Sequence, residues 1–382
     1  MKKIKVWLMM ALCAVIASCT ANEEEGLGMN DSQTIVLRIG SAADTKAVET
    51  PGTSSDKATL TNGYMFFATN NGAIRRCYKL LESGTTNITK LEVSVTDITG
   101  VDGYTFDNVP GDVAKVYILA NVPESGETTE DNIRKQTTLD GVKALNIQVT
   151  DQKTYTSVTM DGLGNVSKKA DGGDNEKEVT VNLQVFCSRL EIPSLTASGD
   201  ITSFKVKGIY VSHFYKQVPL TEVVSSADGN LYKYTSANAG DYTTTYKMLA
   251  DVDDGSDGLG EGTGTTTVTA GSGSEVWAYQ FIPGASGAGR EGIRVVIALS
   301  DVTGSGSYSG TQYLNIRGLV ANSNSDPNPT AMPLERGKIY NMGANLTFDE
   351  GDLSTVPNPD DISLTVKITV TPWGVETVKP IL

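Results

Sequence analysis

Residues 34–39 read Thr-Ile-Val-Leu-Arg-Ile, and this stretch decides the class of fold. Three aliphatic residues in it, Ile35, Leu37 and Ile39, alternate with residues that suit the opposite face of a strand. A period of two is typical of a β-strand that is buried on one side. The same alternation recurs most regularly at residues 363–371, near the end of the chain. Both segments therefore predict strands.

The rest of the chain repeats this pattern between turns. It holds 39 glycines and only 7% aromatic residues, and its segments rich in Thr, Val and Ser indicate an all-β protein. The length suits two domains, and residues 161–178, which are polar and lack an apolar period, are the expected boundary. Residues 130–145 predict a short helix. Further strands are expected at residues 64–68, 74–81, 91–95, 104–106, 114–123, 179–187, 204–211, 231–234, 276–282, 293–299, 313–316 and 339–348. The turn residues Asn70-Asn71-Gly72 predict a hairpin between the first two of these, and the mostly apolar run at 114–123 predicts a central strand covered on both faces.

The first residues carry an export signal. Three lysines precede an apolar run at residues 6–17, which is shorter than the roughly 20 residues that a membrane-spanning helix needs. Cys19 follows Ala17 and Ser18 directly, and this arrangement resembles the lipobox of bacterial lipoproteins. It implies a signal peptide at residues 1–18 and a lipid on Cys19. The alternative is an ordinary signal peptide with a chance cysteine.

Two polar segments flank the first strand. Residues 20–32 lack an apolar pattern and are expected to form a tether. Residues 40–55 consist mostly of small polar residues with Pro and Gly, and we expect an exposed loop that a protease can cut. Residues 19–46 are therefore treated as one segment, consisting of the tether, the first strand and the start of this loop.

The net charge argues against one class of partner, and the cysteine positions argue against a disulfide. The formal net charge is −14, so an anionic nucleic acid is not an expected partner. Cys13 leaves with the signal and Cys19 carries lipid, which leaves Cys77 and Cys187. The period of residues 179–187 places Cys187 on the buried face as a small core residue, so a disulfide is the less favoured interpretation.

No catalytic or metal-binding pattern is present. His213 is the only histidine and is expected on the surface or on an edge strand. The acidic cluster at residues 251–257 fails the spacing of a calcium loop, because Gly262 stands where a bidentate glutamate would close the site, and a solvated loop is expected. The sequence has no Gly-x-Ser-x-Gly elbow and no phosphate-binding loop. Two distant carboxylates could still serve glycoside hydrolysis, but no pair is indicated. We expect neither an enzyme nor a cofactor.

The terminal strand offers a means of joining subunits. In residues 363–371 the apolar face consists of Leu364, Val366, Ile368 and Val370. An extended segment of this kind can add to an exposed sheet edge. Burying four such side chains would contribute on the order of 6–12 kcal/mol before ordering costs. The alternative is that both amphipathic strands only complete their own sheets.

Taken in order, these features resemble the fimbrillins, the type V pilins that build surface fimbriae of Gram-negative anaerobes. The resemblance is carried by the lipobox at Cys19, by the strand and loop at residues 34–47, by Phe-Asp-Asn-Val-Pro at 106–110 with the strand at 116–121, by Pro-Leu-Glu-Arg-Gly-Lys-Ile-Tyr at 333–340, and by the terminal strand at 366–373.

The resemblance implies a fold and a maturation route. It implies two transthyretin-like β-sandwich domains in tandem, at residues 47–175 and 176–382. It also implies export as an outer-membrane lipoprotein, followed by cleavage by a trypsin-like protease after a basic residue behind the first strand. That bond is Lys46–Ala47 here, where the family usually has arginine.

The resemblance further implies assembly by strand exchange. Loss of the first strand, with its Ile35, Leu37 and Ile39, opens a hydrophobic groove that the C-terminal segment of a neighbouring subunit fills. The expected partners are copies of this chain, related fimbrial subunits and the processing protease, and the expected location is an extracellular fimbria that supports adhesion and colonisation. The residues expected in the polymerisation strand are Leu364, Val366, Ile368, Val370, Trp373 and Val375.

A second function stays open at this point. The chain could instead be a monomeric surface lipoprotein, or a fimbrial tip adhesin, that binds a glycan or a host ligand. In that case the glycine-rich loops would form the site, and aromatic residues such as Tyr308 or Tyr313 would line a groove.

Overall fold

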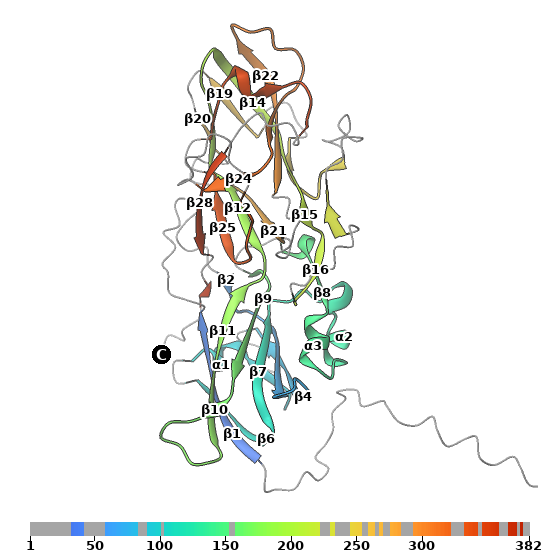
Figure 1. Cartoon of the computed structure of the whole chain (residues 1–382), viewed down its shortest axis with the longest axis vertical. Helices are drawn as coiled ribbons and strands as arrows, with labels where there is room; N and C mark the ends of the chain where they lie inside the picture. Colours follow the sequence, from blue (N-terminus) through green and yellow to red (C-terminus); the bar gives the residue numbers. More distant parts are fainter. Residues whose placement is uncertain are drawn as a thin grey trace, which may run out of the picture.

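The computed structural model is an elongated molecule built mainly from β-strands (Figure 1). It describes residues 32–41, 58–82, 90–100, 103–152, 157–221, 230–233, 245–253, 259–263, 267–269, 276–283, 293–321, 332–342, 346–358, 366–372 and 375–376. The all-β fold class that the sequence predicted is confirmed.

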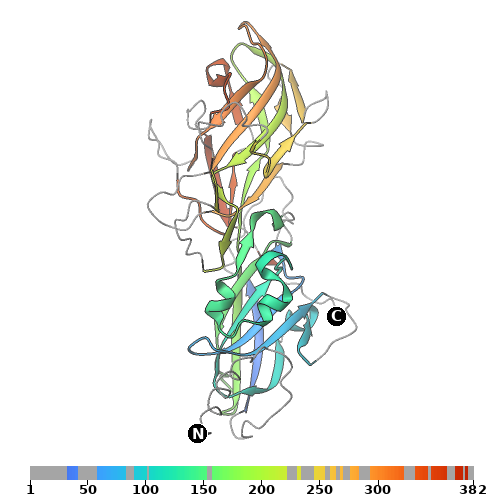
Figure 2. The same ribbon diagram turned by 90° about the vertical axis from the view of Figure 1, so that its right-hand side faces the viewer.

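The first half of the chain holds one large sheet and, apart from η6, the short helices of the described residues. In place of the single helix expected at residues 130–145 there are two, which lie side by side on one flank of the molecule (Figure 2). The elements are β1 (Ser32–Ser41), β2 (Ala58–Thr59), β3 (Gly63–Thr69), β4 (Ile74–Leu81), β5 (Glu92–Ser94), α1 (Val95–Ile98), β6 (Tyr104–Pro110), β7 (Val113–Ala120), η1 (Gly126–Thr128), α2 (Glu130–Arg134), α3 (Leu139–Lys143), β8 (Asn146–Gln148), η2 (Val149–Asp151), β9 (Met160–Asn165), β10 (Ser167–Lys168) and β11 (Glu176–Val185).

In the second half the described elements are strands, except for the short helix η6. The elements are β12 (Ser188–Ile192), β13 (Ser194–Ala197), β14 (Ile201–Ser212), β15 (Phe214–Tyr215), β16 (Gln217–Pro219), β17 (Leu231–Tyr232), β18 (Leu249–Val252), β19 (Gly260–Thr263), β20 (Thr267–Thr269), β21 (Trp277–Phe281), β22 (Arg294–Gly304), β23 (Gln312–Ile316), β24 (Leu319–Ala321), β25 (Lys338–Asn341), β26 (Leu346–Phe348), η6 (Glu350–Asp352), β27 (Leu353–Ser354), β28 (Val366–Pro372) and β29 (Val375–Glu376).

The large sheet has the strand order β5-β4-β3-β7-β9-β11-β1-β6. The predicted hairpin is present, because β3 and β4 pair antiparallel around the Asn-Asn-Gly turn. The predicted central strand β7 lies between β3 and β9, and Val116 to Ala120 are all buried, as its nearly continuous apolar run requires. Side chains from β1, β6 and β11 pack with those of β3 and β7 into one core, here called the N-terminal core.

A second core, here called the shared core, joins the two halves. Tyr117 of β7 and Leu139 of α3 belong to the same buried cluster as Phe204 and Ile297 of the second half. The second-half strands form two principal sheets, with the orders β21-β12-β25-β28-β24 and β18-β14-β22-β23-β27. A short antiparallel pairing of β8 with β16 adds a backbone link between the halves.

The chain crosses from one half to the other at residues 185–188. β11, which the sequence-based boundary at 175/176 assigned to the second half, pairs with β1 and β9 of the large sheet. Arg336 contacts the chain on both sides of this crossing. Its Nε donates to the Val185 carbonyl at 2.9 Å, and its guanidinium lies 4.8 Å from the centre of the Phe186 ring. It also forms an ion pair with Asp161. The domain boundary stays a prediction, and the strand pairing favours a position near Phe186.

Candidate functional site

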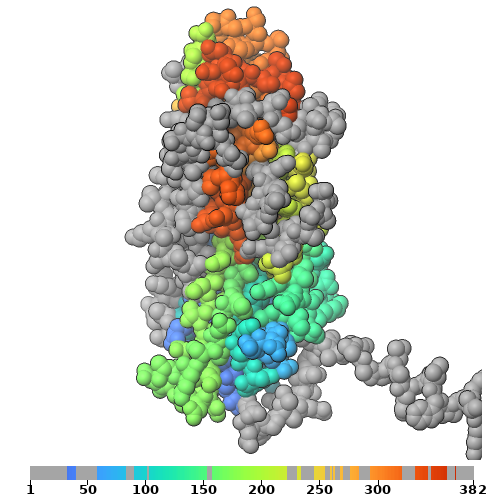
Figure 3. Space-filling model, in the orientation of Figure 1, coloured from blue at the N-terminus to red at the C-terminus, as the bar shows by residue number. Residues whose placement is uncertain are grey.

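The first strand occupies an interior place in the large sheet. β1 pairs in parallel with β11 along residues 34–41 and antiparallel with β6, whose Phe106 lies opposite Ile35. On the face shown in Figure 3, only small dark-blue areas of β1 reach the surface beside the green atoms of β10 and β11. We call the space between β6 and β11 the β1 seat. Without β1, two strand edges with unpaired backbone groups would face each other across it.

The inner face of β1 contributes to the N-terminal core. Ile35 and Leu37 are completely buried and Ile39 is partly buried, in the alternation that the sequence predicted. Phe106 of β6 and Val181 of β11 belong to the same cluster. Full burial of an isoleucine or leucine side chain contributes about 1.5–3 kcal/mol, so the β1 seat is a strongly apolar site.

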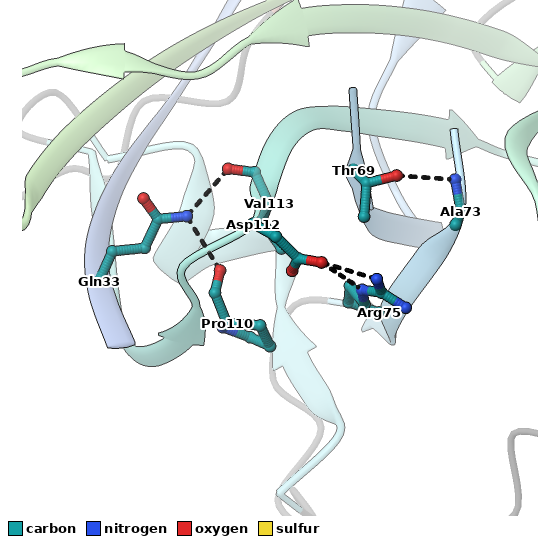
Figure 4. Close-up of polar contacts among 7 residues, drawn as sticks. All are labelled: Gln33, Thr69, Ala73, Arg75, Pro110, Asp112 and Val113. Carbon is teal, nitrogen blue, oxygen red and sulfur yellow. Dashed lines mark hydrogen bonds and ion pairs between the residues drawn. The ribbon is translucent and has the colours of Figure 1, made fainter. Parts of the chain in front are cut away.

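The beginning of β1 is fixed by Gln33. Its side-chain amide is buried and donates to the carbonyl oxygens of Pro110 and Val113, at 3.0 and 2.9 Å (Figure 4). The same turn between β6 and β7 is held from its other side, where Arg75 donates to the Asp112 carboxylate at 2.9 and 2.6 Å. The 110–113 turn therefore closes one end of the β1 seat.

The outer face of β1 carries polar contacts. Arg38 forms an ion pair of 2.9 Å with Glu178 of β11, and the side chains are 42% and 31% exposed. On the other side, the Thr34 hydroxyl donates to Asp107 of β6 at 3.2 Å. Exposed pairs of this kind contribute only about 0–1 kcal/mol. They add little stability, but Glu178 marks the position at which a strand in this seat can carry a positive charge.

Gly103 allows the chain to pass close to β1. Its φ is +78°, and an added Cβ would lie 2.5 Å from the carbonyl oxygen of Leu37. A side chain at this position would collide with the backbone of β1, and the left-handed conformation also favours glycine. Sequence reasoning missed Gly103, Gln33 and Glu178, because the parallel pairing of β1 with a strand some 140 residues away leaves no local signal.

The terminal strands lie in the second half. β28 is interior to its sheet, parallel to β24 and antiparallel to β25, and Val366 is buried. For Ile368 and Val370 the structure places the backbone in β28. Val375 begins β29, whose backbone pairs in parallel with β2 at Ala58. Leu364, Trp373, Cys19, Lys46, Ala47 and the expected signal peptide lie outside the described residues.

His213 is not on the surface as expected. It is only 5% exposed and adopts a φ of +64° directly after β14. Burial, together with the nearby positive charges of Arg294 and Lys233, lowers the pKa of His213 to about 3. Its Nδ1 lies 3.2 Å from the Ser212 hydroxyl. It is thus a neutral structural residue at physiological pH. The expectation rested on the residue type alone, and the local sequence gives no signal for the distant segments that bury this side chain.

The acidic cluster is only partly a loop. Asp251 lies in β18 rather than in a solvated loop, and it accepts a hydrogen bond of 2.8 Å from the Tyr279 hydroxyl. Burial and this carboxylate raise the pKa of Tyr279 well above its ordinary value. Asp254 and Asp257 lie outside the described residues. Among the described side chains, no group of three or more His, Cys, Asp or Glu is placed to hold a metal ion.

The two remaining thiols belong to separate cores. Cys77 and Cys187 are buried free cysteines, the first in the shared core and the second in the N-terminal core. Burial raises the pKa of Cys187 to about 12, so its thiol is unreactive. The interpretation of Cys187 as a core residue is confirmed.

The tyrosines of the glycan hypothesis are not brought together. Tyr308 packs against the shared core, whereas Tyr313 packs against a separate cluster that contains Tyr210 and Tyr246. In the part of the chain that the structure describes, no helix has the length and apolar character to cross a membrane.

Comparison with known proteins identifies the fold. No family model matches the sequence, and no curated protein matches it either. Solved structures do match. A candidate cell adhesion protein from Bacteroides eggerthii aligns over 91% of this chain and 97% of its own, with a TM-score of 0.54 and 16% identity. A candidate cell adhesion protein from Parabacteroides distasonis aligns over 90% and 98%, with a TM-score of 0.55 and 12% identity.

A fimbrilin from Porphyromonas gingivalis aligns over 90% of this chain and 98% of its own, with a TM-score of 0.49 and 12% identity. The first two matches show that this chain has the fold of such adhesion proteins over about nine-tenths of its length. The resemblance that the sequence predicted is therefore confirmed for the fold. Both solved proteins are described as candidate cell adhesion proteins.

Proposed function

We propose that this chain is a structural subunit of a surface fimbria that polymerises by β-strand exchange. In this proposal it belongs with the fimbrillins and consists of two transthyretin-like β-sandwich domains. The observation that carries the proposal is the position of β1. A single strand fills a seat between β6 and β11 with two completely buried aliphatic side chains. The segment that follows it, at residues 42–57, contains the Lys46–Ala47 bond at which the resemblance implies cleavage.

Cleavage changes how β1 is held. In the uncut chain β1 is tethered to its seat, so its effective concentration there is high. A cut between Lys46 and Ala47 removes the tether, and only the core contacts of Ile35, Leu37 and Ile39 and the backbone hydrogen bonds remain. A strand from a second copy then competes on equal terms for the same apolar site.

The incoming strand restores what the lost strand supplied. The edges of β6 and β11 regain backbone hydrogen bonds, and alternate aliphatic side chains refill the core. The uncut chain cannot polymerise, because its seat is occupied. This protects the subunit from premature association during export.

The N-terminal segment supplies the route to the surface. The signal at residues 1–18 directs export, and Cys19 receives lipid and holds the precursor in the outer membrane. Cleavage after Lys46 then separates the lipid from the subunit, which joins the extracellular fimbria. The acidic surface, with a formal charge of −14, discourages unspecific association and leaves assembly to the strand. The likeness to two solved structures described as candidate cell adhesion proteins supports a role in attachment.

The experiment compares two lysines in the same segment. Cells express the wild-type chain, Lys46→Gln or the matched control Lys57→Gln, and surface protein is analysed by N-terminal sequencing and by unheated gel electrophoresis. Wild type and Lys57→Gln should begin at Ala47 and run as a ladder of multimers. Lys46→Gln should keep its acylated Cys19 and run as a monomer.

A ladder of multimers from uncleaved Lys46→Gln would contradict proteolytic activation. A wild-type chain that keeps Cys19 and stays monomeric would contradict the fimbrial subunit and favour an anchored surface lipoprotein.

A further inference from the structure

The first strand has a sequence counterpart near the end of the chain. Residues 35–39 read Ile-Val-Leu-Arg-Ile, and residues 364–368 read Leu-Thr-Val-Lys-Ile. Among the 31 lysines and arginines, only Arg38 and Lys367 have an aliphatic Val, Ile or Leu at positions −3, −1 and +1. In a strand this pattern places three aliphatic side chains on one face and the cation on the other.

The two strands also have the same kind of neighbours. β1 lies between a parallel strand, β11, and an antiparallel strand, β6. β28 lies between a parallel strand, β24, and an antiparallel strand, β25. Along the described residues, β24 pairs with β28 at residues 319–321, and β11 pairs with β1 along residues 176–183. The β1 seat therefore offers β28 the same combination of one parallel and one antiparallel neighbour.

Two carboxylates mark the outer rim of the β1 seat. Glu178 on β11 contacts Arg38, and Asp107 on β6 contacts Thr34. When β1 leaves, Arg38 leaves with it. An incoming strand that carries a cation at the same position replaces the ion pair, whereas one that carries an acid there meets a like charge.

The resemblance already implies that the C-terminal segment of a second copy fills the β1 seat, and we propose that β28 of that copy enters in the register that places Lys367 over Glu178. This inference rests on the proposed function and adds the register and the residue that sets it. Val366 then takes the place of Leu37, and Ile368 that of Ile39.

The last residues of the chain fit less well. If Lys379 took the place of Arg38, Glu376 would replace the buried Ile35 and Pro380 would replace Ile39. A carboxylate would then lie in an apolar core, and proline would remove a backbone donor from the ladder.

The test measures the coupling between Glu178 and Lys367. The full chain, cut after Lys46, is mixed with fluorescent peptides of residues 362–374 that carry either Lys367 or the Lys367→Glu substitution. The second receptor is the full chain with Arg38→Glu and Glu178→Lys, in which the resident strand keeps an ion pair of reversed polarity. The wild-type seat should bind the lysine peptide roughly two- to fivefold more tightly than the glutamate peptide, and the reversed seat should show the opposite preference.

A cross-link tests the register. Gly40 lies opposite Asn182, so the proposed register places Thr369 of the peptide there. A peptide with Thr369→Cys should form a disulfide with the Asn182→Cys chain and not with the Gln184→Cys chain, which a slip by two residues would require.

The outcomes separate the two proposals. Equal peptide preference on both seats, or a cross-link at position 184, overturns the register and the role of Glu178. Polymers that form while neither peptide binds show that another segment donates, and strand exchange stands. A cut chain that neither polymerises nor binds peptide overturns both proposals.

Discussion

Arg336 and Asp161 form an ion pair although 175 positions separate them in the sequence. The pair joins the turn before β25 to β9, and the Tyr117 hydroxyl donates to the same carboxylate at 2.9 Å. Both charged side chains are largely buried, with 16% and 13% exposed. Because Arg336 also donates to the chain crossing at Val185, the two halves are expected to unfold together.

Replacing Arg336 should loosen this junction. We expect Arg336→Gln to lower the free energy of unfolding by about 2–4 kcal/mol, because it leaves the Asp161 carboxylate in a largely buried site. Urea unfolding measures the change. The control is Arg75→Gln, whose ion pair with Asp112 is exposed and should cost no more than about 1 kcal/mol. Equal effects of the two substitutions would contradict a special role of the junction.

Shortening the inner face of β1 should weaken the precursor and speed exchange. Leu37→Ala removes a completely buried side chain and should lower the free energy of unfolding by about 2–5 kcal/mol. After cleavage, β1 with Leu37→Ala should leave its seat faster. The release rate of a labelled 19–46 segment measures this change. Val36→Ala, on the outer face, is the control and should change stability by under about 1 kcal/mol. An unchanged release rate for Leu37→Ala would argue against the core contacts as the restraint.

Gly103 should tolerate no side chain. Gly103→Ala combines a left-handed backbone with a Cβ placed 2.5 Å from the Leu37 carbonyl, and it should cost about 2–4 kcal/mol. Two controls separate the cost of the left-handed backbone from the cost of the clash. Gly310→Ala has a φ of +71° with open space around the Cβ and should cost about 1–2 kcal/mol. Gly173→Ala has open space and no left-handed backbone, and it should be close to neutral. A cost for Gly103→Ala no larger than that for Gly310→Ala would exclude the clash.

His213 should make the fold sensitive to acid. Its pKa falls from an ordinary 6.5 to about 3 on folding, so the unfolded chain binds more protons between these values. The contribution of His213 to the free energy of unfolding is therefore fully present above pH 6.5 and is lost as the pH falls toward 3. The free energy of unfolding should fall by about 2–3 kcal/mol from this cause between pH 7 and 4.5.

The variant His213→Asn suits the left-handed backbone and does not titrate. The difference in unfolding free energy between wild type and His213→Asn should change by that amount over the same pH interval. A difference that is independent of pH would show that His213 is not buried as a neutral group.

Much of the fold could be predicted from local patterns. The alternation at residues 34–39 and 179–187 marks half-buried strands, because one face of each meets the core. The Asn-Asn-Gly turn marks the β3–β4 hairpin, and the nearly continuous apolar run of β7 marks its central position. Each of these signals lies within a few neighbouring residues.

The rest depends on contacts between distant segments. Nothing within β11 indicates that it pairs in parallel with β1, so the boundary drawn at 175/176 separated two neighbouring strands. His213 comes directly after β14, and its backbone N–H donates to the carbonyl of Tyr232 in β17 at 2.7 Å, a contact that no local pattern indicates. Glu178 resembles any exposed acid on a strand, and only the pairing with β1 shows which cation it contacts.

The path of β11 has a mechanical consequence. It holds β1 along residues 176–183, then pairs with β9, and continues through the crossing into β12 along the long axis of the molecule (Figure 1). In a fibre assembled through the β1 seat, tension would enter along β11 and leave along β12. The hydrogen bonds of the inserted strand would be loaded in shear, all at once, instead of being unzipped one by one. Rupture would then require many bonds to break together, which suits a filament that must resist flow.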